Sequence, residues 1–461
     1  MTAVETKMKT RELRILSPCG ILGYGFPEES FLRGIERQPH VIAVDAGSTD
    51  AGPHKLGAGV GIVSVQSTRR DLALLMTHAH QLGIPLIIGS AGGAGARPHV
   101  EWTLRIAEEI AREARLGFDA AVIYSDVDPA IVRDKLAAGR IEPLGPAPEL
   151  TGESLAATRS IVVQMGSEPI VEALDRGAQL IVAGRAYDPA PFAALPIREG
   201  YDPGLATHLG KILECGALCA EPGTAKDAII GYLRQDHFAV EALSPERRCT
   251  TTSVAAHTLY EKDHPYLLHG PGLVLDLSAC EFEQRSDAGV EVRGSQLQVQ
   301  ERYRLKLEGA AQVAFRTFAI AGIRDPIIVR RIDEVTAGVV ESVEQQYPEV
   351  RGRDYEIIFH LYGKNGVMGE LEPEAEPAHE LGVVIDVVAA TQELASAICA
   401  SARSTMLHYP LPGRKSTAGN LAFPFAPSDV EFGPVYRFTI YHLVDVDDPG
   451  ELTSIEYRTV G

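Results

Sequence analysis

Short apolar runs alternate with amphipathic stretches through the first half of the chain. A short continuous apolar run is typical of a buried strand, and apolar residues at helical spacing are typical of a helix. The expected strands are 14–17, 41–44, 86–88, 120–124, 161–164 and 180–183. The expected helices are 31–37, 70–82, 98–115, 129–138 and 169–176. This alternation predicts an α/β domain over residues 1–240, built on a doubly wound, mostly parallel sheet.

From about residue 229 the pattern changes to strands separated mainly by turns. The expected strands are 229–233, 238–243, 273–277, 290–292, 298–307, 312–320, 355–362, 382–388, 435–444 and 453–457. Two helices are expected among them, at 326–347 and 391–408. Because antiparallel strands can be joined by tight turns, consecutive strands favour antiparallel pairing. We therefore predict an α+β domain with an antiparallel sheet over residues 241–461.

Composition and charge narrow the function classes. The chain has 43 Lys and Arg against 62 Asp and Glu, and the net charge of −19 disfavours nucleic acid and anionic membranes as partners. No apolar run reaches the length of a membrane span, and residues 1–12 lack the apolar core of a signal peptide. The six cysteines have no disulfide-type spacing, which fits a reducing compartment. We expect a cytoplasmic protein with a small-molecule substrate.

A glycine-rich loop lies between the strand at 86–88 and the helix at 98–115. Backbone N–H groups at such a junction can face an anion, and glycines permit close approach of a ligand. The spacing matches neither the Gly-x-Gly-x-x-Gly fingerprint nor a P-loop, so a tight structural turn is an equal alternative. The ligand-binding positions expected here are Gly89, Ser90, Gly92, Gly93, Gly95 and His99.

Charged side chains follow two other predicted strands. Asp45 and Asp50 could bind a cation or polarise water, although Asp is also common in turns. Arg185 could hold a carboxylate or phosphate beside Tyr187, and Asp188 could act as a base or begin an Asp–Pro turn. Because ligands bind beyond the carboxyl ends of strands in such sheets, we expect several loops to meet in one cleft. These loops are 45–54, 89–99, 126–128 and 185–188.

The helix expected at 206–219 carries the strongest acid–base candidate. Glu214 lies in an apolar context, where burial raises a carboxyl pKa, and we expect it to face the same cleft. The alternative is a surface ion pair with Lys211, one turn earlier. Cys215 could be a nucleophile or a buried core cysteine. The His-rich stretch 257–272 resembles a polar pocket wall and lacks the His-Glu-x-x-His zinc motif.

Taken together, several stretches resemble the AtuA family, which is named from acyclic terpene utilisation. The resemblance spans nearly the whole chain, including the segment 260–266. It implies a role in bacterial catabolism of citronellol-like terpenoids beside acyl-CoA enzymes, and some members have a small separate partner subunit. No catalytic residue set comes with it. The stretches that carry it are 17–26, 45–53, 89–95, 183–192 and 210–219.

The function expected from the residues and the resemblance is that of a catabolic enzyme acting on a small carboxylate or acyl-CoA intermediate. A lyase or hydratase is favoured, with Glu214, Asp188, Asp45 and Asp50 as catalytic residues. A metal- or cysteine-dependent hydrolase and a non-catalytic subunit of a degradative complex are the alternatives. No cofactor is identified; a divalent metal or a CoA thioester substrate would fit. We also expect a homo-oligomer, with a small partner subunit as a further option.

Overall fold

The computed structural model describes residues 12–350, 354–374, 376–415 and 417–461, and the chain divides into two compact units. Unit 1 extends to Ala311 and resumes at Phe438–Gly461, and unit 2 is Gln312–Arg437. This division differs from the expected domains 1–240 and 241–461. The reason is that strands after residue 240 continue the sheet of unit 1.

The centre of unit 1 is a set of five parallel strands within a ten-stranded sheet. All of their apolar residues are buried, because helices cover both faces of the sheet. This is why the strands appear in the sequence as continuous apolar runs. In spatial order they are β1 (Leu13–Ser17), β2 (Val41–Asp45), β3 (Leu86–Gly89), β7 (Leu180–Ala183) and β4 (Phe118–Tyr124).

Antiparallel strands extend this sheet at both edges. β9 pairs with β1, and β21 (Ser454–Val460) pairs with β4. Neither the apolar run of β9 nor the alternating pattern of β21 identifies the partner strand, so these strands could not be assigned to the first sheet from sequence. The strands beyond β1 are β9 (Ile229–Leu233), β10 (Phe238–Ala242), β15 (Gly289–Arg293) and β14 (Glu281–Gln284).

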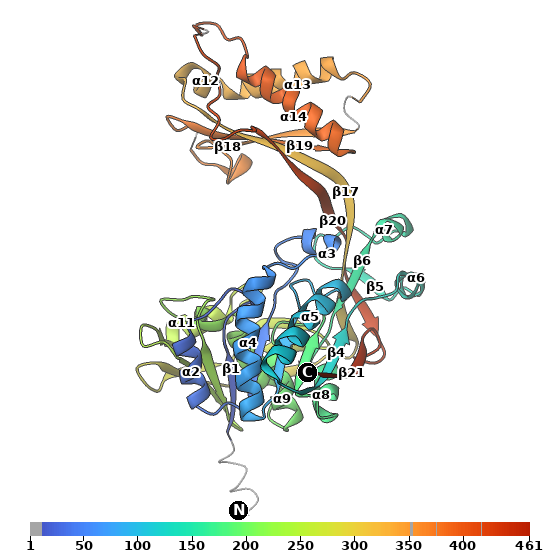
Figure 1. The fold of residues 1–461 in the computed structure, drawn as a ribbon, viewed down its shortest axis with the longest axis vertical. Helices are drawn as coiled ribbons and strands as arrows, with labels where there is room; N and C mark the ends of the chain where they lie inside the picture. Colours follow the sequence, from blue (N-terminus) through green and yellow to red (C-terminus); the bar gives the residue numbers. More distant parts are fainter. Residues whose placement is uncertain (1–11, 351–353, 375, 416) are drawn as a thin grey trace, which may run out of the picture. The chain divides into compact units, whose positions relative to one another are not determined.

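Helices form a layer on each face of the sheet (Figure 1). One apolar core lies under α2 (Glu28–Glu36), α4 (Val65–Leu82) and α5 (Arg97–Ala114). The other lies under α8 (Glu168–Asp175), α9 (Ala190–Arg198) and α10 (Pro203–Leu213). The smaller elements of unit 1 include α3 (His54–Ala58), α6 (Pro129–Ala137), β5 (Ile141–Pro143), α7 (Gly152–Ala157), η1 (Gly216–Cys219), β8 (Ala220–Glu221), β11 (Arg248–Cys249), α11 (Thr251–Thr258), β12 (Leu267–Gly270), β13 (Leu273–Asp276) and β16 (Gln296–Val299).

One predicted strand lies outside the parallel sheet. β6 (Ser160–Gln164) pairs antiparallel with the first part of the long strand β17 (Tyr303–Ile323). The expected strand 312–320 lies within β17, whereas the expected strand 298–307 begins in β16 and ends in β17. The chain passes from unit 1 to unit 2 within β17 and returns within β20 (Asp429–Val446).

Unit 2 is a two-layer α+β structure. The later part of β17 pairs antiparallel with β19 (Leu381–Ala389), which pairs with β18 (Tyr355–Tyr362). α13 (Ile332–Gln346) and α14 (Gln392–Leu407) pack on this sheet, and α12 (Pro326–Arg330) precedes them (Figure 1). The helix expected at 326–347 is therefore two helices, separated at Arg331.

The fold class expected from sequence is confirmed. A largely parallel sheet with helices on both faces is accompanied by separate antiparallel sheets later in the chain. Within the described ranges, no helix combines the length and apolar character that a bilayer crossing requires.

Candidate active site

Asp45, the last residue of β2, is 4% exposed. Its Oδ2 accepts a hydrogen bond of 3.3 Å from the Gly47 N–H. Its Oδ1 is buried and has no hydrogen-bond partner among the described residues. Burial, and then the neighbouring carboxylates Asp188 and Glu214, raise the pKa of Asp45 well above its usual value. A buried carboxyl with a vacant acceptor is suited to meet a ligand or a proton.

Glu214 is the residue at which α10 ends. The helix cannot continue because Gly216 adopts a φ of +61°, and a Cβ there would lie 2.8 Å from the Gly20 nitrogen. The Glu214 carboxylate forms an ion pair with Lys211, and the two side chains are only 6% and 3% exposed. Burial raises the pKa of Glu214 to about 7, and Asp188 adds to this rise against the opposing charge of Lys211. The Lys–Glu pair expected as an alternative exists, but it is buried.

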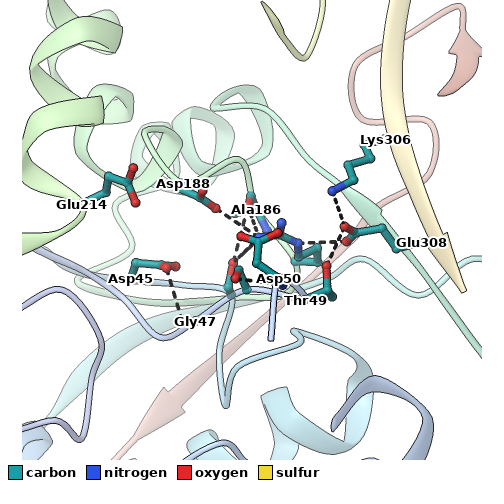
Figure 2. Close-up of polar contacts among 12 residues, drawn as sticks. Asp45, Gly47, Thr49, Asp50, Ala186, Asp188, Glu214, Lys306 and Glu308 are labelled. Atoms are coloured by element: carbon teal, nitrogen blue, oxygen red, sulfur yellow. Dashed lines mark hydrogen bonds and ion pairs between the residues drawn. The ribbon is translucent and has the colours of Figure 1, made fainter. Parts of the chain in front are cut away.

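The four residues predicted to be catalytic line one cavity of about 250 Å³. Figure 2 shows Asp45, Asp188 and Glu214 on one side of the region and Glu308 with Lys306 on the other. The cavity wall also includes the loop after β1 and the residues Tyr260 and Glu261. The loops after β1, β2 and β7 thus meet at this cavity. Of the four loops expected to meet in one cleft, 45–54 and 185–188 contribute lining residues, whereas 89–99 and 126–128 contribute none. The residues shared with the prediction are Asp45, Asp50, Asp188 and Glu214.

Arg185 faces internal partners. Its guanidinium is 1% exposed and donates hydrogen bonds to Glu308 Oε2 at 3.0 Å and to Asp188 Oδ1 at 3.1 Å. It also donates to the hydroxyl of Ser90 and the carbonyl oxygen of Ala186. Ligand binding by Arg185 stays a prediction. The observed contacts give it a positioning role, because they fix the carboxylate of Asp188 at the cavity.

Glu308, in the first part of β17, is a residue that the sequence reasoning missed. It is fully buried and accepts hydrogen bonds from Thr49 Oγ1 at 2.7 Å, Lys306 Nζ at 2.7 Å and Arg185. Burial disfavours the charged form, but Arg185 and Lys306 outweigh it and hold the pKa of Glu308 at about 2. The available signal was a single carboxylate within an apolar strand, since burial of an ionised group requires paired charges.

The glycine-rich loop is buried and packed against neighbouring backbone. Gly92, Gly93 and Gly95 have φ values of +67°, +113° and +67°. The N–H groups of Ser90 and Ala91 donate to the carbonyls of Gly184 and Ala183, and the N–H of Gly93 donates to Ser90 O. These contacts account for the glycines by tight strand–helix packing. They favour the structural alternative, and anion binding by Gly89–Gly95 stays a prediction.

We expect G95A to lower the free energy of unfolding by about 2 kcal/mol, because its Cβ would lie 2.2 Å from the Arg185 nitrogen. G83A is the matched control. Gly83 ends α4 with a similar φ of +62°, and a Cβ added there would have no atom of the described residues within 4 Å. We expect G83A to cost about 1 kcal/mol. Chemical denaturation measures both variants, and equal losses would contradict the close-packing explanation.

The other two predicted ligand-binding residues are also buried. His99 Nε2 lies 3.1 Å from Lys55 O and 3.2 Å from Val60 O, so the ring fastens the segment around α3 to the start of α5. Burial lowers the pKa of His99. Tyr187 follows Arg185, and burial raises the pKa of its phenol. Direct ligand contact by either residue stays a prediction.

The segment after α11 supplies a wall of the site that was only partly anticipated. His257 stacks on Tyr260 with ring centroids 5.4 Å apart, and Lys211 Nζ lies 5.6 Å from the Tyr260 centroid. Lys262 Nζ lies 5.8 Å from the centroid of Tyr187. Burial, and then Lys211, lower the pKa of His257 to about 4. The His-rich composition signalled a pocket wall, but Lys262 was not singled out.

The structure also bears on metal and thiol chemistry. In the part of the chain that the structure describes, no group of three or more His, Cys, Asp or Glu residues is arranged to hold a metal ion. All six cysteines are free. Burial, followed by the nearby charge of Glu214, raises the pKa of Cys215, so its thiol stays protonated at neutral pH. A protonated thiol is a poor nucleophile.

These features define an α/β protein with a buried carboxyl cluster at the carboxyl ends of its parallel strands. The family model described as "Acyclic terpene utilisation family protein AtuA" matches residues 66–424. The chain therefore belongs to the AtuA family, whose description names acyclic terpene utilisation. No curated protein and no solved structure matches the chain.

Proposed function

We propose that this chain is an acid–base enzyme of acyclic terpenoid breakdown, either a lyase or a hydratase. The observation that carries the proposal is the grouping of Asp45, Asp188 and Glu214 at one cavity, with raised pKa values for Asp45 and Glu214. Neighbouring carboxyls with different environments can supply an acid and a base at the same pH. Lyases and hydratases need such a pair.

The environments of the three carboxyls suggest separate roles. Asp188 accepts a hydrogen bond from Arg185 and lines the cavity, so we assign it the role of base. Glu214 and Asp45 are buried near that charge and would supply the acid. Because the charge of Glu214 raises the pKa of Asp45, these two carboxyls titrate as a pair and not independently.

The charge of the cavity wall bears on the substrate. Asp188, the proposed base, and Asp50 are on this wall beside the two proposed acids, so a free carboxylate would be repelled there. A neutral carbonyl group, such as an acyl thioester or a ketone, fits better. The phosphates of a CoA thioester would remain outside the carboxyl cluster. Of the two substrate classes expected from the sequence, this preference favours the acyl-CoA intermediate over the small carboxylate.

The alternatives have weaker support. A cysteine hydrolase needs a thiolate, whereas burial keeps the Cys215 thiol protonated. A non-catalytic subunit has no use for several acids gathered at a cavity, since burying them destabilises the fold. Cytoplasmic location, homo-oligomer formation and a small partner subunit remain part of the proposal.

The test is a substrate screen on the full chain. Acyclic terpenoid acids, ketones and acyl-CoA thioesters are incubated with the protein in D₂O, and mass spectrometry follows gain or loss of water and deuterium incorporation. We expect turnover of at least one neutral carbonyl compound, and a loss of about a hundredfold or more in D45N. D126N is the matched control, since Asp126 follows β4 but does not line the cavity. Turnover unaffected by D45N would contradict the proposal.

A further inference from the structure

The cavity that holds the carboxyl cluster also has an apolar wall. Tyr24, from the loop after β1, and Tyr260, from the segment after α11, both line the cavity, and each is 41% exposed. Ligand pockets are lined mainly by apolar and aromatic side chains, because covering such surface with an apolar group releases water. The apolar wall consists of Ile21, Tyr24, Leu218, Ala225 and Tyr260.

Asp71 of α4 fixes the loop that carries Tyr24. Its side chain is 2% exposed, and its Oδ2 accepts hydrogen bonds of 2.9 Å from both the Gly23 N–H and the Gly25 N–H. Its Oδ1 accepts a hydrogen bond of 2.8 Å from Arg70. The two glycines have φ values of +102° and +83°, which side chains other than glycine rarely adopt. One buried carboxylate therefore holds the backbone on both sides of Tyr24.

Further contacts hold the two parts of the apolar wall in place. The Leu22 N–H donates to the Asp45 carbonyl oxygen at 2.9 Å, which ties the loop after β1 to the strand end that carries a proposed acid. In the segment after α11, the His257 ring stacks on Tyr260 with an interplanar angle of 22°. Because these groups are already ordered, a ligand that covers the wall loses little affinity to the ordering of side chains.

We propose that the apolar wall binds the hydrocarbon chain of the substrate through Tyr24 and Tyr260, and that Asp71 is the positioning residue for Tyr24. This inference rests on the proposed function and adds to it an acyclic aliphatic chain attached to the neutral carbonyl group. A methylene group needs about as much space as a water molecule, about 30 Å³, so the cavity of about 250 Å³ holds about eight carbons. Carbons beyond this number would remain in water.

Binding of a homologous series of ketones to the full chain tests the proposal without requiring turnover. Isothermal titration calorimetry is run with unbranched 2-alkanones from butanone to undecan-2-one. We expect the affinity to rise roughly fourfold for each added carbon up to about octan-2-one and then to level off, since a buried methylene contributes about that factor. Affinity that does not rise with chain length, or no binding of octan-2-one up to its solubility limit, would overturn the proposal.

Variants show whether the two rings provide this gain. We expect Y24A and Y260A each to bind octan-2-one about tenfold more weakly than the wild type, the effect of losing roughly 55 Å² of apolar contact. Butanone has less chain to lose contact with, so its affinity should change by less than about twofold. Y362A is the matched control, since Tyr362 is 50% exposed but belongs to unit 2. Losses in Y24A and Y260A no larger than that in Y362A would refute the assignment.

The role of Asp71 is tested by a double-variant cycle. D71A should weaken octan-2-one binding about as much as Y24A does, and D71A/Y24A should bind no more weakly than Y24A, because both changes act through one ring. D71N keeps an acceptor oxygen for the two N–H groups, so its affinity should stay within about threefold of the wild type. Additive losses in the double variant would contradict the positioning role.

The binding and turnover results separate this proposal from the proposed function. If affinity is independent of chain length while D45N abolishes turnover, only the apolar wall fails as a binding surface. If Y24A and Y260A lose affinity as expected while D45N turns over normally, the acid–base function fails and the chain-binding surface stands.

Discussion

Replacing Glu308 with alanine is expected to lower the free energy of unfolding by about 3–5 kcal/mol, the range found when one partner of a buried ion pair is removed. The variant would leave Arg185 buried without its main counter-charge and Thr49 without its acceptor. Lys306 would lose the same partner. Urea denaturation followed by circular dichroism measures the loss.

Two controls isolate the charge. E308Q keeps the side-chain size and an acceptor oxygen, so we expect a smaller loss than for E308A. E172A removes one member of the exposed i,i+4 pair with Arg176, and we expect a change below about 1 kcal/mol. A loss for E308A no larger than that for E172A would show that the buried network contributes little.

The stability that Glu308 and its partners contribute depends on pH. The folded pKa of Glu308, about 2, lies below the ordinary glutamate value, so its contribution is present above about pH 4.3 and is lost as the pH falls toward 2. Wild-type stability should therefore fall more steeply over this acid range than the stability of E308Q.

Replacing Glu214 with glutamine is expected to reduce turnover of an identified substrate by about a hundredfold or more, the usual contribution of a general acid or base. Glutamine keeps the shape and can still accept from Lys211, but it cannot deliver a proton. Steady-state kinetics on the full chain gives the result, with D126N again as the control. Turnover within a few-fold of wild type would remove Glu214 from the mechanism.

The stability contributed by Glu214 changes with pH in the opposite direction to that contributed by Glu308. The pKa of Glu214 in the folded protein, about 7, lies above the ordinary value, so the stability from its protonated form is present below about pH 4.3 and is lost as the pH rises through 7. Activity that uses Glu214 as an acid should also decline above about pH 7. The stability and the residual activity of E214Q should both change less with pH in this range than those of the wild type.

The parallel centre of the fold was predictable because its strands are buried on both faces. The runs that became β2, β3 and β7 are continuously apolar, and such runs need no knowledge of the partner strand to be recognised. The partners of β9 and β21 were not predictable. Both the apolar β9 and the more polar β21 could pair with several other strands, and the choice depends on contacts distant in the sequence.

Some residues of the candidate site were likewise predictable from the sequence, and others were not. Asp45 and Asp188 were found because they follow predicted strands, where the fold class places ligands, and Glu214 was found because it lies in an apolar stretch, where a carboxyl is buried. The partner of Arg185 was not found, since Glu308 lies 123 residues later and reaches the site only through the pairing of β17 with β6. The glycine loop carries an ambiguous pattern, because tight packing and anion binding select the same residue.

The discontinuity of unit 1 has a consequence for synthesis on the ribosome. β4 is complete at Tyr124, but its antiparallel neighbour β21 begins only at Ser454, after the whole of unit 2 has been made. At about 5–20 residues per second, the wait is on the order of tens of seconds. During that time the N–H and C=O groups along one edge of β4 lack their final partner and can pair with another chain. Nascent chains of this protein should therefore depend on chaperones that cover exposed strand edges until the last residues emerge.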